Sequence, residues 1–247
     1  MPTDFNLKLR QLIHATDTLL WDAYRSAISG THHAGQLVFP KTSQGKVRVS
    51  EQEAKQFLIG NLGISPFSFS VETPTIGSYS FSGVGMRNAM TDLSLYAEGV
   101  GFVNMEFKAG NTSTKRKNRG KIAKDIQKIV LEDVAGFWFH TLKATNRSSV
   151  ATLWQTIRQE LKAVIQETTV PLRSKLFTFH CCVLREAFSV QTTFRLDELS
   201  RANDWLAEVK PPSFRVQGGN LIEAQDADGW IVNRHVPKVE AATMEVN

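Results

Sequence analysis

The chain has 247 residues, 42% of them hydrophobic, and carries 29 Lys and Arg against 24 Asp and Glu, a formal charge of +5. These values exclude a disordered chain and fit one large domain, or a domain with an appended subdomain. The pI of about 9.2 permits an anionic partner without requiring one. The only cysteines, Cys181 and Cys182, are neighbours, which excludes a spaced disulfide framework. Since no apolar run has membrane length and no signal pattern opens the chain, we expect a cytoplasmic protein and no membrane partner.

Hydrophobic periodicity and turn residues predict an α/β sandwich with a mixed sheet. In chain order, the first predicted elements are a helix over 4–29 and a loop over 30–47. A second helix begins with the capping-box spacing of Ser50 and Glu53 and ends at Gly60 or Gly63. It is followed by a strand over 67–73 that ends before Pro74, a loop or short strand over 76–90, and two strands within 90–111. There follow a helix over 118–133, a strand over 135–144, a helix over 149–167, a strand over 175–184, a strand over 190–196, a helix over 196–209 and a loose tail in the last ten residues.

A hairpin is predicted where the sequence reads MTDLSLYAEGVGFVNMEFKAGN, residues 90–111. With a five-residue loop, Tyr96 lies opposite Phe102 and Asp92 lies opposite Glu106. Directly paired residues have Cβ atoms about 4.5–5.5 Å apart. The two carboxylates are therefore predicted to be neighbours on one face of the sheet.

Two neighbouring carboxylates repel each other unless a cation lies between them, and Mg²⁺ or Mn²⁺ prefers such oxygen ligands. Lys108 shares the face of Glu106, because strand side chains alternate. It is thus placed to orient water or to stabilise developing negative charge. Glu-x-Lys occurs four times in the chain, but only this one lies in an apolar strand with an Asp across a hairpin. The alternative is a solvent-facing hairpin with its polar residues outward.

At these residues the chain resembles the PD-(D/E)XK nuclease superfamily, the restriction-endonuclease-like fold. The motif of that family, an Asp on the second core strand and (D/E)-x-K on the third, maps to Asp92 and to Glu106-Phe107-Lys108. The family core is helix, three strands, helix, strand, which matches the predicted order over about residues 50–143. Thr91 stands where the family name has proline. The resemblance implies a mixed central sheet flanked by helices.

The resemblance also implies a function, a metal-dependent nuclease that hydrolyses phosphodiester bonds, with DNA as the expected substrate. Asp92 and Glu106 would then bind Mg²⁺ or Mn²⁺, and Lys108 would assist the attacking water. A Glu on the preceding helix often completes the metal site in this family, and Glu53 is expected in that role, with Glu51 in reserve. The alternative for Glu53 is its place in the capping box.

Basic residues follow Lys108 closely and suit a phosphate backbone, which proteins contact mainly through Lys and Arg. Lysines recur on one predicted helical stripe opposite the isoleucines, with further cations in the preceding loop and one before the Asp92 strand. The predicted nucleic-acid-binding residues are Arg87, Lys115, Arg116, Lys117, Arg119, Lys121, Lys124 and Lys128. Gln127 or Lys128 is also a candidate to reach the metal site. The alternative is a solvated helix face.

Three segments are predicted: an N-terminal helix and loop over 1–45, a nuclease-like core over 46–185, and a C-terminal extension with a loose tail over 186–247. No separate recognition domain is evident. Specificity is therefore expected from the C-terminal third, from a homodimer or from a partner protein. The rival reading is a non-catalytic nucleic-acid-binding or assembly subunit with a nuclease-like fold.

Overall fold

The computed structural model describes residues 3–32, 34–63, 65–81, 84–97, 100–110, 116–146, 149–168, 175–199, 210–217, 220–225 and 227–235. Its helices are α1 (Thr3–Ser29), α2 (Glu51–Leu62), α3 (Arg116–Leu131), α4 (Ser149–Glu167) and the single turn α5 (Leu196–Leu199). Its strands are β1 (Ser68–Phe81), β2 (Val84–Ala97), β3 (Val100–Ala109), β4 (Ala135–Leu142), β5 (Leu176–Val183), β6 (Phe188–Arg195), β7 (Ser213–Gln217), β8 (Asn220–Gln225) and β9 (Trp230–Arg234). None of the helices in these ranges is both long enough and apolar enough to cross a membrane.

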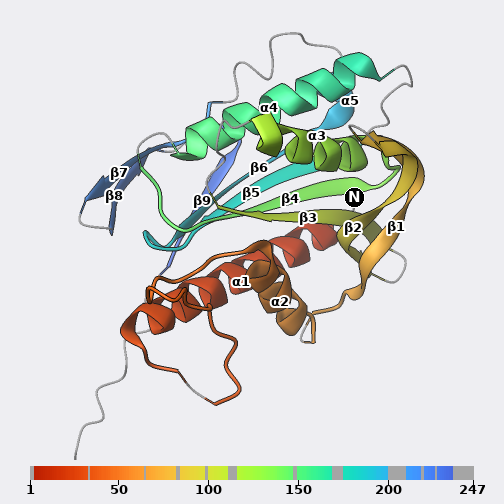
Figure 1. The fold of residues 1–247 in the computed structure, drawn as a ribbon. Helices are drawn as coiled ribbons and strands as arrows, with labels where there is room; N and C mark the ends of the chain where they lie inside the picture. The colour runs from red at the N-terminus through yellow and green to blue at the C-terminus, as the bar shows by residue number, and fades with distance from the viewer. Residues whose placement is uncertain are drawn as a thin grey trace, which may run out of the picture.

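A mixed seven-stranded sheet in the order β1-β2-β3-β4-β5-β6-β9 forms the centre of the α/β fold. β1, β2 and β3 form an antiparallel meander, β3, β4 and β5 are parallel, and β6 and β9 add antiparallel strands. Helices α1 and α2 cover one face of this sheet and α3 and α4 cover the other (Figure 1). β7 and β8 form a separate two-stranded sheet. The carboxyl ends of the three parallel strands therefore meet at one edge.

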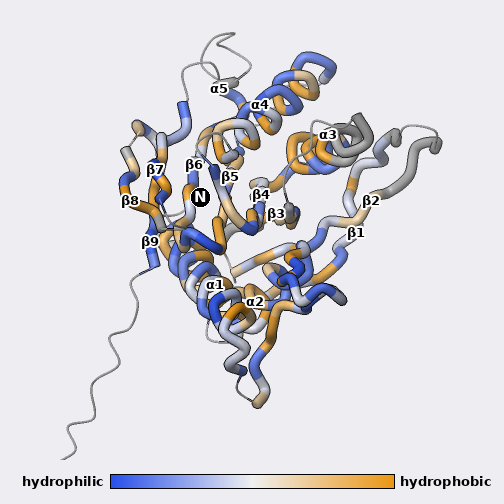
Figure 2. Tube along the Cα trace, turned by 60° about the vertical axis from the view of Figure 1, so that its left-hand side comes forward, coloured by the Kyte–Doolittle hydropathy of each residue, from blue (hydrophilic) through white to orange (hydrophobic). Residues whose placement is uncertain are grey.

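Two hydrophobic cores lie on the two faces of the sheet. One joins α1 and α2 to alternate residues of the strands, including Leu93, Met105 and Phe107. The other joins α3 and α4 to the opposite face, including Trp138 and Phe179. Hydrophobic and hydrophilic colours alternate along α1 and α4, as expected of helices with one buried side (Figure 2). Burial of these stripes provides most of the driving force for folding.

Helix α1 also makes a buried polar contact with strands β5 and β6. Asp17 is completely buried. Its Oδ1 lies 3.0 Å from His180 Nε2 on β5, and its Oδ2 accepts a hydrogen bond of 2.6 Å from Ser189 Oγ on β6. A buried carboxylate is tolerated only with such partners. This contact therefore fixes α1 at one position across β5 and β6.

The four long predicted helices and the central strands are confirmed, but β1 and β2 are both longer than predicted, since β2 begins at Val84 within the segment 76–90, predicted as a loop or short strand. The sequence predicts a strand that ends before Pro74, but β1 continues to Phe81 after a register shift. Thr75 Oγ1 donates to Ala89 O and accepts from Ala89 N, so a side chain bridges the gap in the ladder. Of the helix predicted over 196–209, residues 196–199 are helical; its remainder, and the tail, lie outside the described residues. The sequence patterns do not predict strands β7, β8 and β9.

Helix α3 lies very close to β4, and a single glycine permits that approach. A Cβ atom on Gly136 would overlap the side chain of Ile129. Gly136→Ala should therefore lower the free energy of unfolding by about 1–3 kcal/mol, as over-packing does in other cores. Urea unfolding measures this. The control is Gly60→Ala in α2, where a Cβ meets nothing within 4 Å, and it should be neutral or stabilising. A Gly136→Ala protein as stable as the parent would contradict the close approach of α3 and β4.

Candidate functional site

The predicted pairing of Tyr96 with Phe102 is confirmed, but the predicted five-residue loop is too long, because Ala97 pairs with Val100 after a register shift. Tyr96 pairs with Phe102, and the last ladder pair is Leu93 with Met105, so one further step places Asp92 beside Glu106. Just beyond the last ladder pair, a side chain replaces the backbone acceptor: Asp92 Oδ2 accepts a hydrogen bond of 2.8 Å from the backbone N–H of Phe107 on β3. This hydrogen bond fixes the Asp92 carboxylate against β3.

Four carboxylates surround the ammonium of Lys108, at the carboxyl end of β3. Asp125 Oδ2, on α3, lies 2.9 Å from Lys108 Nζ. Asp92 Oδ2 and Glu106 Oε2 each lie 3.9 Å from it, and Glu51 Oε2, at the start of α2, lies at 4.0 Å. Two helices and two strands from both faces of the sheet therefore converge on one cation.

A second lysine lies beneath the first. Lys128 on α3 is 4% exposed. Its Nζ lies 2.6 Å from Glu106 Oε1 and 2.9 Å from Asp125 Oδ1, and donates to Met90 O at 2.8 Å. Three acceptors match the three ammonium protons. Lys128 is therefore a buried counter-ion that fixes α3 against β2, whereas Lys108, with 20% of its side chain exposed, faces the solvent side of the cluster.

The carboxyl groups respond to this environment in different ways. Burial, together with the carboxylate of Asp125, raises the pKa of Glu106 to about 8, against the opposing effect of Lys128. Burial alone would also raise the pKa of Asp125, but Lys108 and Lys128 outweigh it and hold that pKa below its usual value. The carboxylates raise the pKa of Lys108 and Lys128 in spite of burial, so both stay charged. With every group ionised, the four carboxylates and two ammonium groups sum to a formal charge of −2.

Replacing the ionisable carboxyl group of Glu106 by an amide should change how the free energy of unfolding depends on pH. Its pKa is raised from 4.5 to about 8 in the folded chain, so between these values the folded state binds a proton that the unfolded state has released. Glu106 therefore contributes a fall in the free energy of unfolding as pH rises from about 4.5 to about 8, and Glu106→Gln should remove that contribution relative to the parent. Burial lowers the pKa of His140 to about 4, which contributes a rise with pH between about 4 and 6.5 in parent and variant alike. Urea unfolding of parent and variant across this range without divalent ions measures the contribution of Glu106. The exposed control Glu167→Gln should keep the parental dependence, and retention of that dependence by Glu106→Gln would contradict the assignment.

The helix carboxylate that reaches the cluster is Glu51 rather than Glu53. Glu53 Oε2 accepts from Ser50 N at 2.7 Å and from Ser50 Oγ at 2.6 Å, so it is occupied by the capping box. Glu51, two residues earlier on the same helix, lies close to Lys108. The helix start therefore uses one carboxylate for its own cap and presents the other to the site.

The structure places Lys128 differently from the predicted basic stripe. It is buried against Glu106 and Met90 rather than exposed, because the β1–β2 hairpin lies against that side of α3. It is the candidate from α3 that reaches the site. Lys124 is half-buried. The side chains of four other predicted cations on α3 are not described: Arg116, Lys117, Arg119 and Lys121. The side chain of Arg87 on β2 is not described either, and Lys115 lies outside the described residues.

Asp125 is the site residue that the sequence patterns do not identify. It is the only acidic residue between 116 and 128 and lies three positions before Lys128. Its position as a single carboxylate within a strongly basic helix could have identified it, since such a group pairs with neighbouring cations. Asp125 bridges both lysines of the cluster, with one oxygen to each.

The donor set suits a hard divalent cation. Every candidate ligand is a carboxylate oxygen, which Mg²⁺ and Mn²⁺ prefer, and one such ion would neutralise the formal charge of the cluster. Glu106 Oε2 is buried and accepts no hydrogen bond from any described residue, which leaves an acceptor for a ligand. As the side chains stand, no group of three or more His, Cys, Asp or Glu in the described ranges is arranged to hold a metal. The four carboxylates of the cluster lie around Lys108 Nζ instead.

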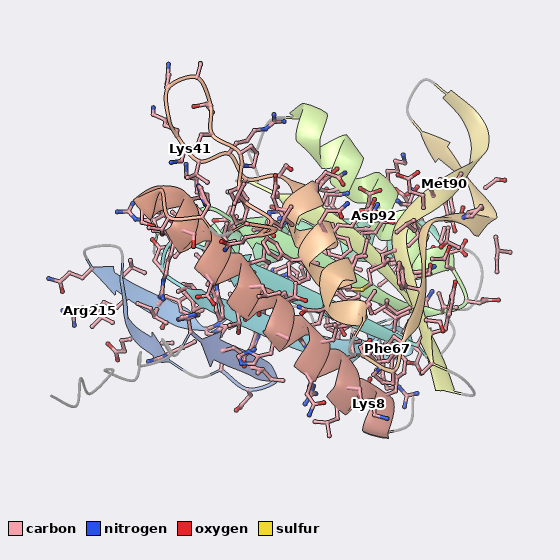
Figure 3. The ribbon with its side chains drawn as sticks, turned by 90° about the horizontal axis from the view of Figure 1, so that it is seen from below. Lys8, Lys41, Phe67, Met90, Asp92 and Arg215 are labelled. Atoms are coloured by element: carbon pink, nitrogen blue, oxygen red, sulfur yellow. The ribbon has the colours of Figure 1, made fainter. Side chains whose placement is uncertain are left out.

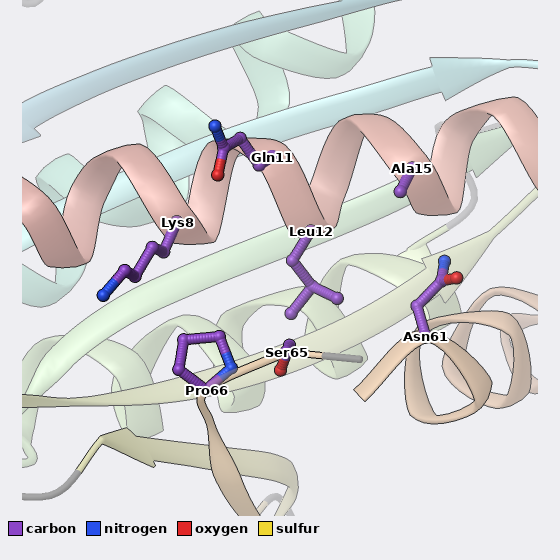
Figure 4. A pocket seen from close by; sticks show the side chains of 7 residues that line it. All are labelled: Lys8, Gln11, Leu12, Ala15, Asn61, Ser65 and Pro66. Carbon is purple, nitrogen blue, oxygen red and sulfur yellow. The ribbon is translucent and has the colours of Figure 1, made fainter. Parts of the chain in front are cut away.

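A separate recess of about 220 Å³ lies between α1 and the segment that joins α2 to β1 (Figure 4). Lys8, Leu12 and Asn61 are among its lining residues, and none of the described residues that line it is a carboxylate. It shares no residue with the cluster around Lys108. We therefore assign it no part in the chemistry of that cluster.

No protein-family model matches the chain, and no curated protein or solved structure matches it significantly. A function must therefore be inferred from the residues and their geometry alone.

Proposed function

We propose that the chain is a metal-dependent nuclease of the PD-(D/E)XK kind that hydrolyses phosphodiester bonds, with DNA as the expected substrate. The observation that carries the proposal is the convergence of Asp92, Glu106 and Lys108 at the end of one buried hairpin, with Glu51 from the preceding helix. The order α2-β1-β2-β3-α3-β4, with antiparallel β1 to β3 and parallel β3 and β4, supports a restriction-endonuclease-like core.

Asp92 and Glu106 would hold Mg²⁺ or Mn²⁺, and Glu51 would support them from α2. When bound, such an ion supplies charge stabilisation and an activated nucleophile for hydrolysis. Lys108 presents its ammonium on the exposed side of the cluster, where it stabilises negative charge that develops on a phosphate. Lys128 stays buried and fixes the position of Glu106.

One observation favours the rival, a non-catalytic nucleic-acid-binding or assembly subunit. Glu106 is already paired with Lys128, and the carboxylates converge on an ammonium rather than on an open position. A chain that never binds a metal would keep this arrangement as a buried ionic network. The two functions differ in whether divalent ions bind and promote cutting.

Metal binding is the first test. Mn²⁺ or Mg²⁺ at about 100 times its Kd should raise the Tm by about 5–10 °C, since a ligand specific for the folded state stabilises it. Asp92→Asn, which keeps an oxygen to accept from Phe107 N, should remove most of this rise. The exposed control Asp228→Asn should retain it.

Cutting is the second test of the same proposal. Single- and double-stranded DNA and RNA are incubated with the parent protein in Mg²⁺ or Mn²⁺, and with Ca²⁺ to measure binding alone. Cutting that depends on the metal and disappears in Asp92→Asn supports the nuclease. Binding without cutting under all these conditions would replace it with the rival.

A further inference from the structure

A short hairpin just before α2 presents three cations to solvent. Lys41 and Val47 form a β-bridge, and the turn between them is closed by Thr42 N–H donating to Lys46 O at 2.8 Å. Gly45 has φ of 73°, a conformation that favours glycine and closes the turn. Val47 is buried, whereas Lys41, Lys46 and Arg48 are exposed. The hairpin therefore holds its cations on a defined turn.

This hairpin is attached to the ends of the central strands. Lys143, after β4, donates from Nζ to Val47 O at 2.7 Å. Arg185, after β5, donates its backbone N–H to Lys143 O at 3.0 Å. An open cavity of about 520 Å³ is lined by Lys143 and Arg185 together with Tyr24 of α1. We call the five residues Lys41, Lys46, Arg48, Lys143 and Arg185 the basic rim.

The basic rim lies along the sheet edge that carries the candidate site. β3, β4 and β5 are parallel, so Lys108, Lys143 and Arg185 all lie at or just beyond the carboxyl ends of neighbouring strands. Arg48 precedes, by three residues, Glu51, which lies 4.0 Å from Lys108 Nζ. Seen from below, Lys41 and Lys8 lie at opposite margins of the molecule, and Asp92 lies between them nearer the middle (Figure 3). Ligands of open α/β sheets commonly bind at this edge.

Within the described part of the chain, none of the exposed cations Lys41, Lys46, Arg48 and Arg185 forms a salt bridge. The nearest acidic residues along the chain are Glu51 and Glu186. Glu51 lies 4.0 Å from Lys108 Nζ, and Glu186 is buried, accepts from Thr145 N at 3.0 Å and attracts Arg185. Isolated surface cations are ordinary, but these are gathered on anchored backbone beside a cluster suited to phosphodiester chemistry.

We propose that the basic rim binds the phosphate backbone of DNA to one side of the phosphate that is cut. This inference rests on the proposed nuclease function and assigns it a substrate-contacting surface other than α3. A phosphate backbone is a repeating anion, and contacts from spaced Lys and Arg position it without reading sequence. The rim continues along the strand ends from Lys108, whereas helix α3 covers one face of the sheet (Figure 1).

The test compares two variants that each remove three positive charges. Lys41→Gln/Lys46→Gln/Arg48→Gln changes the hairpin, and Arg10→Gln/Lys162→Gln/Arg215→Gln changes exposed cations on α1, α4 and β7. Binding to double-stranded DNA is measured by fluorescence anisotropy in Ca²⁺ at several salt concentrations, with the Tm checked for both variants. The hairpin variant should bind at least about tenfold more weakly, and the slope of log K against log salt should fall by about 0.9 for each phosphate that the rim no longer neutralises. The control should keep the parental slope.

Equal affinity and slope in the hairpin variant and the parent would overturn the proposal while leaving nuclease function intact if the parent cuts. Equal weakening in the hairpin and control variants would also overturn it, because total charge would then explain the effect. A parent protein that neither binds nor cuts DNA would instead remove the proposed function, and the rim assignment with it.

Discussion

Lys108→Ala is expected to lower the rate of metal-dependent cleavage by about 10²–10³-fold while DNA binding persists. The lysine lies within 4.0 Å of all four carboxylates and is the partly exposed cation of the cluster. It is therefore placed to act on charge that develops in the transition state. Its removal leaves every candidate metal ligand in place, so metal binding should be equal or tighter.

Single-turnover cleavage and anisotropy in Ca²⁺ separate these effects. A fall in rate with little change in affinity marks an interaction made mainly in the transition state. The matched control is Lys162→Ala, an exposed lysine on α4, which should cut at the parental rate. A Lys108→Ala protein that cuts as fast as the parent would place the catalytic centre elsewhere on the chain.

Lys128→Met is expected to lower the free energy of unfolding by about 3–5 kcal/mol in the absence of divalent ions. The change keeps an apolar stem of similar length but removes the cation that lies 2.6 Å from Glu106 and 2.9 Å from Asp125. The ionised carboxylate of Asp125 then loses one of its two cations, Glu106 loses its closest partner, and Met90 O is left without its donor. Breaking a buried pair from one side is costly because the remaining charge stays desolvated.

A double variant separates the effect of packing from that of uncompensated charge. Lys128→Met/Glu106→Gln removes both members of the closest pair, so it should recover part of the stability that Lys128→Met alone removes, with a coupling of about 0.5–3 kcal/mol. Urea unfolding of the parent, both single variants and the double variant gives this coupling. Additive effects, or a Lys128→Met protein as stable as the parent, would show that the lysine is no essential counter-ion.

The hairpin at the heart of the site could be predicted from sequence because its geometry is local. Strand side chains alternate strictly and a short turn fixes the register, so Tyr96 opposite Phe102 places Asp92 beside Glu106. The capping box of Glu53 is also local, and its spacing is visible in the sequence. What sequence left open was whether Glu53 serves the cap or the site, and the contacts of Ser50 assign it to the cap.

The site residues on α3 were harder to predict, because the helical periodicity of a sequence distinguishes only one buried and one exposed side of a helix. The isoleucines of α3 pack on the sheet and α4, and the periodicity therefore assigns the lysines to solvent. The β1–β2 hairpin curves over a further side of the helix: Glu132, just after α3, accepts from Gly77 N at 2.9 Å and from Tyr79 Oη at 2.5 Å. Lys128 is buried by this third surface, which depends on strand twist and on contacts between distant residues.

The buried contact of Asp17 has a consequence for how the chain is made. Its two partners, His180 and Ser189, follow it by 163 and 172 residues. At about 5–20 residues per second, a ribosome needs roughly 10–35 s to synthesise that interval. Throughout this time the carboxylate of Asp17 lacks the two partners that it has in the folded chain, so this contact of α1 forms only after β6 has been made. The hydrophobic contacts of α1 differ in this respect, because its core partners on α2, β2 and β3 are synthesised earlier.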